Sequence, residues 1–168
     1  TQSEKLMYSP KFEHDACGMG FITQVDGHPS HELVEKALTM LQRMNHRGGT
    51  GAEPDTGDGA GILMSMPDAF FRSHMAKYEL TLPAKGDYAV AQLFLPHDEE
   101  QRDAMLAAVT DRMKDAGFPV LWTRSVPFVY ESCGPAAQQS MPGFAQVIIK
   151  RSVDIKPGQD FEDRLYKL

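Results

Sequence analysis

The segment from Arg47 to Gly61 constrains this chain most, because it places six glycines among fifteen residues, RGGTGAEPDTGDGAG. Glycine loses more conformational entropy on ordering than any other residue, and this segment has almost no apolar side chain to bury in return. We therefore expect a long loop here, with the regular elements on either side of it.

The residues after the glycines exclude a nucleotide-binding loop. In dinucleotide sites and phosphate loops, a glycine-rich turn leads into a helix whose N-terminus holds the phosphate groups. Here the glycines lead into the apolar run ILMSM at 62–66, and no Gly-Lys-Ser/Thr follows them. The run is typical of a strand instead.

Ahead of the loop, the pattern predicts one strand and one helix. The strand spans 17–25 (CGMGFITQV) and ends at the turn signal Asp26-Gly27. The helix is capped by Ser30, and its apolar residues recur at helical spacing through 34–44. It should end near 46–47, where Gly48 and Gly49 offer a left-handed residue just past the helix.

Beyond the loop, strands and helices alternate. We expect strands at 62–66, 88–95, 120–122, 126–129 and 144–150, and helices at 68–78, at 98–116 closed by Gly117, and from a cap at Asp160 onward. The alternation predicts a layered α/β or α+β domain. A chain of 168 residues is long enough to bury a sizeable core as a single domain.

Charge and hydropathy exclude two classes of partner. The net charge is −6, and no basic patch is visible that could neutralise phosphates, so we expect no nucleic acid. No apolar run approaches the roughly 18 residues of a membrane span. Two cysteines are too few for a disulfide scaffold, and residues 1–16 have no secretory signal. We therefore expect a cytoplasmic protein with two free thiols and a polar leader at 1–16.

The acidic and histidine residues do not predict a metal site. Asp55 and Asp58 lie in the loop without the alternating oxygen ligands of a calcium loop, and we expect them to be solvated turn carboxylates. The six histidines are scattered, and no paired zinc-ligand spacing is present.

Two residues stand out chemically. Cys17 opens the first predicted strand and is followed by Gly18 and Gly20; after cleavage behind Ala16 its own α-amine would be a general base for its thiol. From composition alone, a buried inert cysteine remains the alternative. Arg47, beside the glycine loop, suits bidentate capture of a carboxylate, and the alternative is an arginine that stabilises a helix C-terminus.

A resemblance bears on these alternatives. The segments CGMGFI at 17–22, SHELVEKALTMLQRMNHRGG at 30–49 and EPDTGDGAGILMSMPDAFFR at 53–72 resemble, in order and spacing, the class II glutamine amidotransferase domain of glutamate synthase large subunits. The likeness extends over 17–168.

The resemblance implies a fold and a set of site residues. The fold is α+β, the four-layer αββα sandwich of N-terminal-nucleophile hydrolases, here incomplete at its C-terminal side, with 1–16 as propeptide. Cys17 is the catalytic nucleophile that releases ammonia from L-glutamine. Arg47 holds the substrate α-carboxylate, Gly48 belongs to the same motif, and Thr50 adds a polar contact. We expect no cofactor in this chain, and FMN and an iron–sulfur cluster in the synthase domain or subunit that receives the ammonia.

Two departures from the family pattern leave alternatives open. The family's oxyanion-stabilising Asn-Gly segment and its carboxylate for the substrate amine are absent through Leu168, and residues 1–16 still precede Cys17. Loss of one oxyanion donor typically costs about 10²- to 10³-fold in rate. We therefore expect this 168-residue chain alone to be nearly inactive, and keep as alternative a truncated or divergent non-catalytic module. A cysteine hydrolase based on Cys133 is disfavoured, because Ser132-Cys133-Gly134-Pro135 has no obvious basic partner.

Overall fold

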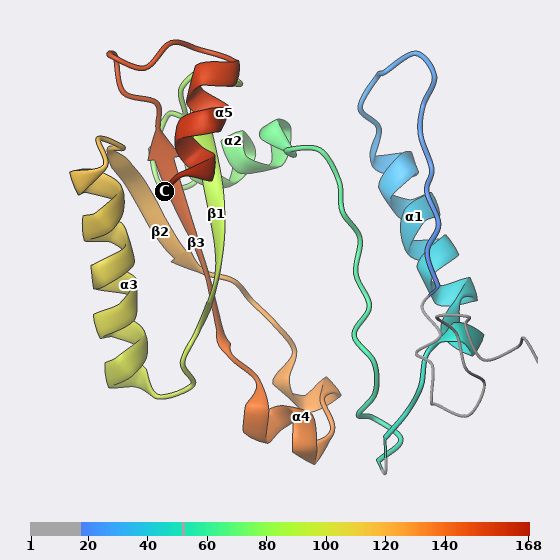
Figure 1. Cartoon of the computed structure of the whole chain (residues 1–168). Helices are drawn as coiled ribbons and strands as arrows, with labels where there is room; N and C mark the ends of the chain where they lie inside the picture. Colours follow the sequence, from blue (N-terminus) through green and yellow to red (C-terminus); the bar gives the residue numbers. More distant parts are fainter. Residues whose placement is uncertain (1–17, 52) are drawn as a thin grey trace, which may run out of the picture. The chain divides into compact units, whose positions relative to one another are not determined.

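The computed structural model describes residues 18–51 and 53–168 (Figure 1). The chain divides into two compact units, one ending at Leu63 and one comprising Met64–Leu168. Each unit has its own set of secondary-structure elements.

The first unit is built on helix α1 (His31–Arg43). Ser30 is its N-cap residue in extended conformation, as predicted, although its side chain accepts no capping hydrogen bond. Glu32 lies in the first turn, where the helix dipole favours a negative charge, and pairs with Lys36 at 2.6 Å. No residue of α1 is fully buried.

The predicted strand at 17–25 is wrong for its described part, because residues 18–25 form no strand. A strand needs a neighbour for its backbone hydrogen bonds, and none pairs with this segment among the described residues. The turn at its end is confirmed: the Gly27 N–H donates to the Gln24 carbonyl oxygen at 3.1 Å, and Gly27 has φ +71°. The strand predicted at 62–66 is absent for the same reason.

The second unit contains an antiparallel three-stranded sheet in the order β1-β3-β2 (Figure 1). Its strands are β1 (Tyr88–Leu95), β2 (Val120–Ser125) and β3 (Gly143–Lys150). This confirms the strands predicted at 88–95, 120–122 and 144–150. The strand predicted at 126–129 is wrong: pairing ends after the Val126 N–H donates to the Phe144 carbonyl, and Pro127 has no N–H to continue it.

Alternating side chains of the sheet enter two separate cores. Val147 and Ile149 of β3 pack with Met113, Phe118 and Phe161, which come from helices α3 (Glu99–Asp115) and α5 (Gln159–Tyr166) and from the residue after Gly117. Ile148 points to the other face and packs with Tyr88 and with residues of α2 (Asp68–Ala76). Residues 147–149 of the central strand are therefore buried on both faces, which explains why this part of the strand is continuously apolar.

The helix ends differ in how well local signals predict them. Asp98 caps α3 as predicted, accepting from the Gln101 N–H at 2.9 Å, and Gly117 follows with φ +87°. The cap predicted at Asp160 is wrong: α5 begins after Gly158 at φ +82°, and the Asp160 carboxylate accepts from the Lys156 N–H. Helix α4 (Pro135–Ser140), which has proline at its first position, and the short 3₁₀ turn η3 (Tyr130–Ser132) were not anticipated.

The structure thus confirms a mixed helix-and-sheet domain. In the part of the chain described, no helix has the length and apolar character needed to cross a bilayer.

Candidate functional site

Arg47 lies at the end of a short 3₁₀ turn, η2 (Asn45–Arg47), which comes directly after α1. Its N–H donates to the Met44 carbonyl at 2.8 Å, and the Gly48 N–H donates to the Asn45 carbonyl at 3.2 Å. The helix therefore ends at Arg43, and the tightened turn carries the chain on to Arg47. The predicted left-handed glycine is wrong: Gly48 has φ −94°, because the 3₁₀ turn already uses these backbone groups.

Gly18 packs against Arg47 without space for a side chain. A Cβ built at Gly18 would lie 3.0 Å from Arg47 Cβ, 3.3 Å from its Cγ and 3.5 Å from Met44 Sδ. Cys17 itself lies outside the described residues, so its side chain is not placed. The residue bonded to it, however, is in contact with the predicted carboxylate-binding arginine.

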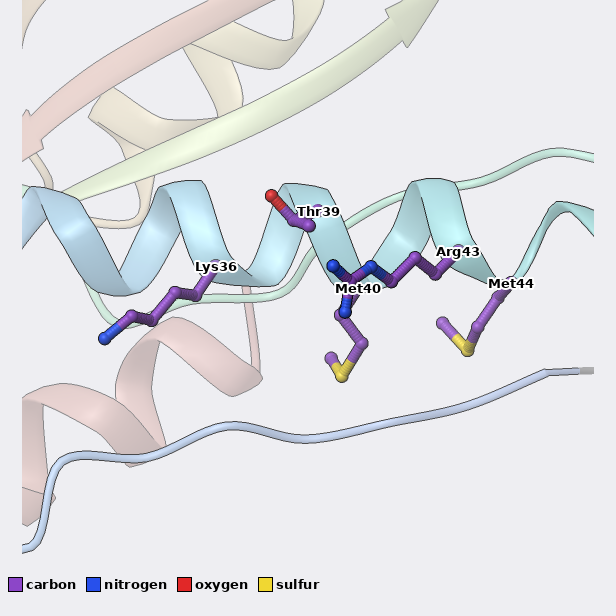
Figure 2. A pocket seen from close by; sticks show the side chains of 5 residues that line it. All are labelled: Lys36, Thr39, Met40, Arg43 and Met44. Atoms are coloured by element: carbon purple, nitrogen blue, oxygen red, sulfur yellow. The ribbon is translucent and has the colours of Figure 1, made fainter.

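The extended segment after Cys17 continues along α1. A Cβ at Gly20 would lie 2.8 Å from Met40 Sδ, one helical turn before Met44. Figure 2 shows Met40 and Met44 pointing from the helix toward this segment. Both glycines therefore serve close approach of the segment to the helix, a role that their sequence pattern did not predict.

The glycine-rich segment is a loop, as predicted, but it is not irregular throughout. Gly49 and Asp58 exchange two hydrogen bonds: the Gly49 N–H donates to Asp58 Oδ2 at 2.8 Å, and the Asp58 N–H donates to the Gly49 carbonyl at 2.9 Å. Further along, the Gly51 N–H donates to the Thr56 carbonyl at 2.7 Å, and Thr50 forms an antiparallel bridge with Gly57. The loop folds back on itself as a small hairpin.

Arg47, Gly48 and Thr50 are exposed and lie close together in the chain, and Gly18 is in contact with Arg47. Sequence reasoning missed Asp58, for which we expected a solvated turn carboxylate, and missed Gly57. The sequence cue for both residues was the turn-forming triplet Gly57-Asp58-Gly59, which in the structure runs back along Gly49 and Thr50. No group of three or more His, Cys, Asp or Glu residues among the described ones could hold a metal ion.

A pocket of about 440 Å³ lies on the flank of α1, lined by Lys36, Thr39, Met40, Arg43 and Met44 (Figure 2). Neither Arg47 nor Gly48 nor Thr50 is among its lining residues. Its apolar lining comes from the same methionines that Gly18 and Gly20 approach. All five lining residues belong to α1 or to its C-cap, Met44, so the pocket is a feature of the helix surface rather than of the predicted site.

Two polar networks of the second unit join α2 to the sheet. Asp68 accepts from Arg72 Nε at 2.9 Å and from the Tyr88 hydroxyl at 2.8 Å. The hydrogen bond from Arg72 holds the pKa of Asp68 below its usual value, while burial and the bond to Asp68 raise the pKa of Tyr88 to about 12. These groups fasten α2 to the start of β1, so we assign them to the fold.

The other network crosses the sheet. Arg124 Nε donates to Gln146 Oε1 at 2.8 Å, and Arg124 Nη1 lies 2.9 Å from His74 Nε2. Burial and the Arg124 charge lower the pKa of His74. The neutral ring therefore accepts from the guanidinium through Nε2.

Cys133, the rejected alternative nucleophile, is half-buried, and its thiol donates a weak 3.9 Å bond to the Val129 carbonyl. No basic side chain is hydrogen-bonded to it within the described part of the chain.

This sequence is similar to known proteins of one family. The family model for class-II glutamine amidotransferases matches residues 17–168. The chain is 41% identical over 160 residues to the large chain of NADPH glutamate synthase from Bacillus subtilis, covering 95% of this chain and 10% of that protein. It is 38% identical over 170 residues to the NADH glutamate synthase of Schizosaccharomyces pombe, covering 98% and 8%.

A plant relative shows the same extent of similarity. The chloroplastic ferredoxin-dependent glutamate synthase of Oryza sativa subsp. japonica is 35% identical over 154 residues, which cover 92% of this chain and 10% of the rice protein. The chain thus spans a tenth or less of the length of these relatives, and the matched family region starts at the cysteine singled out from the sequence.

Proposed function

This chain belongs to the class-II glutamine amidotransferases, and from that premise we propose that it performs the glutaminase half-reaction of a glutamate synthase. In this reaction L-glutamine and water give L-glutamate and ammonia. The proposal draws on three relatives that all carry the name glutamate synthase, although their names differ in the electron donor.

Cys17 is the nucleophile of the proposed mechanism. Once residues 1–16 are removed, its free α-amine takes the thiol proton, and the sulfur attacks the side-chain amide carbon of glutamine. The tetrahedral intermediate collapses as the amine returns a proton to the leaving nitrogen, which releases ammonia and leaves a glutamyl thioester. Water then attacks the thioester, releasing glutamate and restoring the thiol. The family match beginning at residue 17 supports this assignment.

The contact between Gly18 and Arg47 is the observation that carries the proposal. A nucleophile and its substrate clamp must lie within the length of one glutamine molecule. Gly18 is bonded to Cys17 and packs on Cβ and Cγ of Arg47, so the stem of this arginine side chain lies against the residue next to the proposed nucleophile. Arg47 then binds the α-carboxylate with its two parallel N–H donors, and Gly48 and Thr50 border the same stretch.

The partners of the reaction are inferred from the relatives. We place the ammonia acceptor, 2-oxoglutarate, in a synthase region, with electrons from a nicotinamide or ferredoxin donor of the kind that the relatives' names print. The FMN and iron–sulfur cluster that supply the reducing chemistry belong to that region in this proposal. The described residues do not fit a cluster, since no group of three or more possible ligands gathers there.

For the fold we propose the four-layer αββα sandwich. The support comes from the sheet face to which Ile148 points. Helix α2 covers one end of this face, and large aromatic side chains near the other end are exposed to solvent: Phe94 is 69% and Phe128 51% exposed. A second sheet packing on this face would bury them. A solved structure of the full-length protein in which Phe94 remains exposed would contradict this arrangement.

The test uses the full-length protein with Cys17→Ala and, as matched control, Cys133→Ala. We expect Cys17→Ala to abolish glutamine hydrolysis and glutamine-dependent glutamate synthesis, while synthesis from added ammonia continues. Cys133→Ala should behave as wild type in both assays. Glutaminase activity retained in Cys17→Ala would reject the assignment.

Arg47 and the leader need separate measurements. Arg47→Lys keeps the charge but loses the bidentate geometry, so KM for glutamine should rise with a smaller effect on kcat. Intact mass of the protein from its native cells should show a chain that begins at Cys17. A permanently retained leader would favour the alternative, a non-catalytic amidotransferase-like module.

A further inference from the structure

We propose that Asp58 is a positioning residue for Arg47, acting through the backbone of Gly49; this role rests on the proposed glutaminase function. The two residues are nine positions apart and exchange hydrogen bonds in both directions, at 2.8 Å from the Gly49 N–H to Asp58 Oδ2 and at 2.9 Å from the Asp58 N–H to the Gly49 carbonyl. We call this pair, with the strand-like bridge beside it, the loop clip.

The bridge extends the clip away from Arg47. Thr50 pairs with Gly57, and the Gly51 N–H donates to the Thr56 carbonyl at 2.7 Å. Thr56 in turn donates its hydroxyl to Glu53 Oε2 at 2.9 Å and its N–H to the Glu53 carbonyl at 3.2 Å. The returning arm of the loop is therefore held by hydrogen bonds of Thr56 as well as by the bridge.

The clip closes only if residue 57 has no side chain. A Cβ built at Gly57 would lie 2.5 Å from the Gly49 carbonyl oxygen and 3.3 Å from Thr50 Cα. Both neighbours are backbone atoms, which cannot rotate away as a side chain does. The glycine-rich composition of the loop thus has a specific cause at this position.

The consequence concerns Arg47 and the two glycines after it. On one side, the 3₁₀ turn holds the backbone through the bonds of the Arg47 and Gly48 N–H groups to Met44 and Asn45. On the other side, the clip holds Gly49. Two consecutive glycines would otherwise sample many backbone conformations, and fixing them has an entropic cost. Asp58 therefore fixes the segment before substrate arrives.

The loop clip depends on the acceptor oxygen of Asp58, and Asp55 in the same loop does not supply one. The Gly49 N–H needs an acceptor, which an asparagine at position 58 also supplies and an alanine does not. Asp55 is exposed like Asp58, but no hydrogen bond or ion pair of its side chain occurs within the described residues. Asp55→Ala removes the same charge from the same loop and leaves the clip intact.

The experiment compares Asp58→Ala, Asp58→Asn and Asp55→Ala in the full-length protein. We expect Asp58→Ala to raise KM for glutamine about tenfold, the loss that corresponds to one hydrogen bond and the ordering it supports, with little change in kcat. Asp58→Asn should restore KM to near the wild-type value, and Asp55→Ala should match wild type. Synthesis from added ammonia should be unchanged in all three.

Several results would overturn the role of Asp58. The first is a KM for glutamine in Asp58→Ala that equals the wild-type value. The second is an equal rise of KM in Asp58→Asn and Asp58→Ala, which would assign the effect to the charge rather than to the hydrogen bond. The third is a rise of KM in Asp55→Ala as large as that in Asp58→Ala. Amide hydrogen exchange tests the hydrogen bond between Gly49 and Asp58 independently of enzymatic activity. The Gly49 amide should exchange faster in Asp58→Ala than in wild type or Asp55→Ala, and equal exchange would disprove the clip. If wild type hydrolyses no glutamine but shows this exchange pattern, the proposed function fails and the clip stands.

Discussion

Gly18 and Arg47 are in van der Waals contact, with no room for a methyl group between them: a Cβ at Gly18 would lie 3.0 Å from Arg47 Cβ. The residue after the proposed nucleophile and the proposed substrate clamp therefore position each other. Adding a side chain at Gly18, with Gly20 as the comparison, tests whether this contact with Arg47 matters.

Gly18→Ala should reduce kcat/KM for glutamine several-fold in the full-length protein, because the added methyl would push Cβ and Cγ of Arg47 aside by a few tenths of an ångström and catalysis is sensitive to small displacements of positioned groups. Gly20→Ala is the matched control. Its methyl would meet the sulfur of Met40, at 2.8 Å, and a flexible thioether side chain can move aside. Equal losses in the two variants would argue against a specific contact with Arg47.

Tyr88→Phe should change how the stability of the chain depends on alkaline pH. The pKa of Tyr88 is raised to about 12 in the fold, from about 10 when unfolded, so the neutral hydroxyl stabilises the fold fully below pH 10. This contribution is lost as the pH rises from 10 to 12. Over that range wild type should lose roughly 2–3 kcal/mol more than Tyr88→Phe.

Urea unfolding, followed by fluorescence of the single tryptophan Trp122, measures this difference. At neutral pH the variant should be less stable by about 1 kcal/mol, because Asp68 loses one donor. Parallel curves for the two proteins between pH 10 and 12 would refute the assigned pKa.

His74→Gln should remove a loss of stability at mildly acidic pH. Burial and the charges of Arg124 and Lys77 lower the pKa of His74 in the fold. The neutral ring therefore contributes stability that is present above the unfolded pKa of about 6.5 and lost as the pH falls through the lower folded value. Glutamine keeps an acceptor for Arg124 without titrating. Tm measured from pH 7.5 to pH 5 should fall less in His74→Gln than in wild type, and identical slopes would exclude this role.

Gly117→Ala should destabilise the chain by roughly 1–2 kcal/mol, because Gly117 has φ +87° and an alanine is strained there. Space is not the cause, since no atom lies within 4 Å of a Cβ at this position. Gly117→Asn should cost less, because asparagine adopts left-handed conformations more readily. Equal unfolding free energies for the Ala and Asn variants would show that the conformation does not set the cost.

Local patterns predicted those elements whose partners are near in sequence or whose burial is complete. Strands β1 and β3 are largely apolar because the sheet is covered on both faces at one end, and α3 has its cap residue Asp98 and its terminating Gly117 adjacent to it. The strand predicted at 17–25 failed for the opposite reason. Its β-branched residues are compatible with a strand, but a strand exists only with a neighbour, and periodicity carries no information about one.

The candidate site likewise has residues that the sequence could predict and contacts that only the structure shows. Cys17, Arg47, Gly48 and Thr50 could be named from motif and chemistry, and Arg47 and Gly48 are close in the chain to the helix that positions them. The contact of Gly18 with Arg47 and the bond from Gly49 to Asp58 join residues 29 and 9 positions apart. No propensity of the individual residues encodes such pairs.

Residue order alone predicted the glycine-rich loop, the helix before it, and the alternation of strands and helices after it, and it supplied the cysteine and arginine of the proposed site, because each is written in neighbouring residues. Three-dimensional packing established which glycines serve close approach, which of two loop aspartates holds the backbone, and which apolar runs pair as strands. Those outcomes depend on contacts between residues distant in the sequence, where a shift of a few tenths of an ångström decides whether a side chain fits against its neighbour.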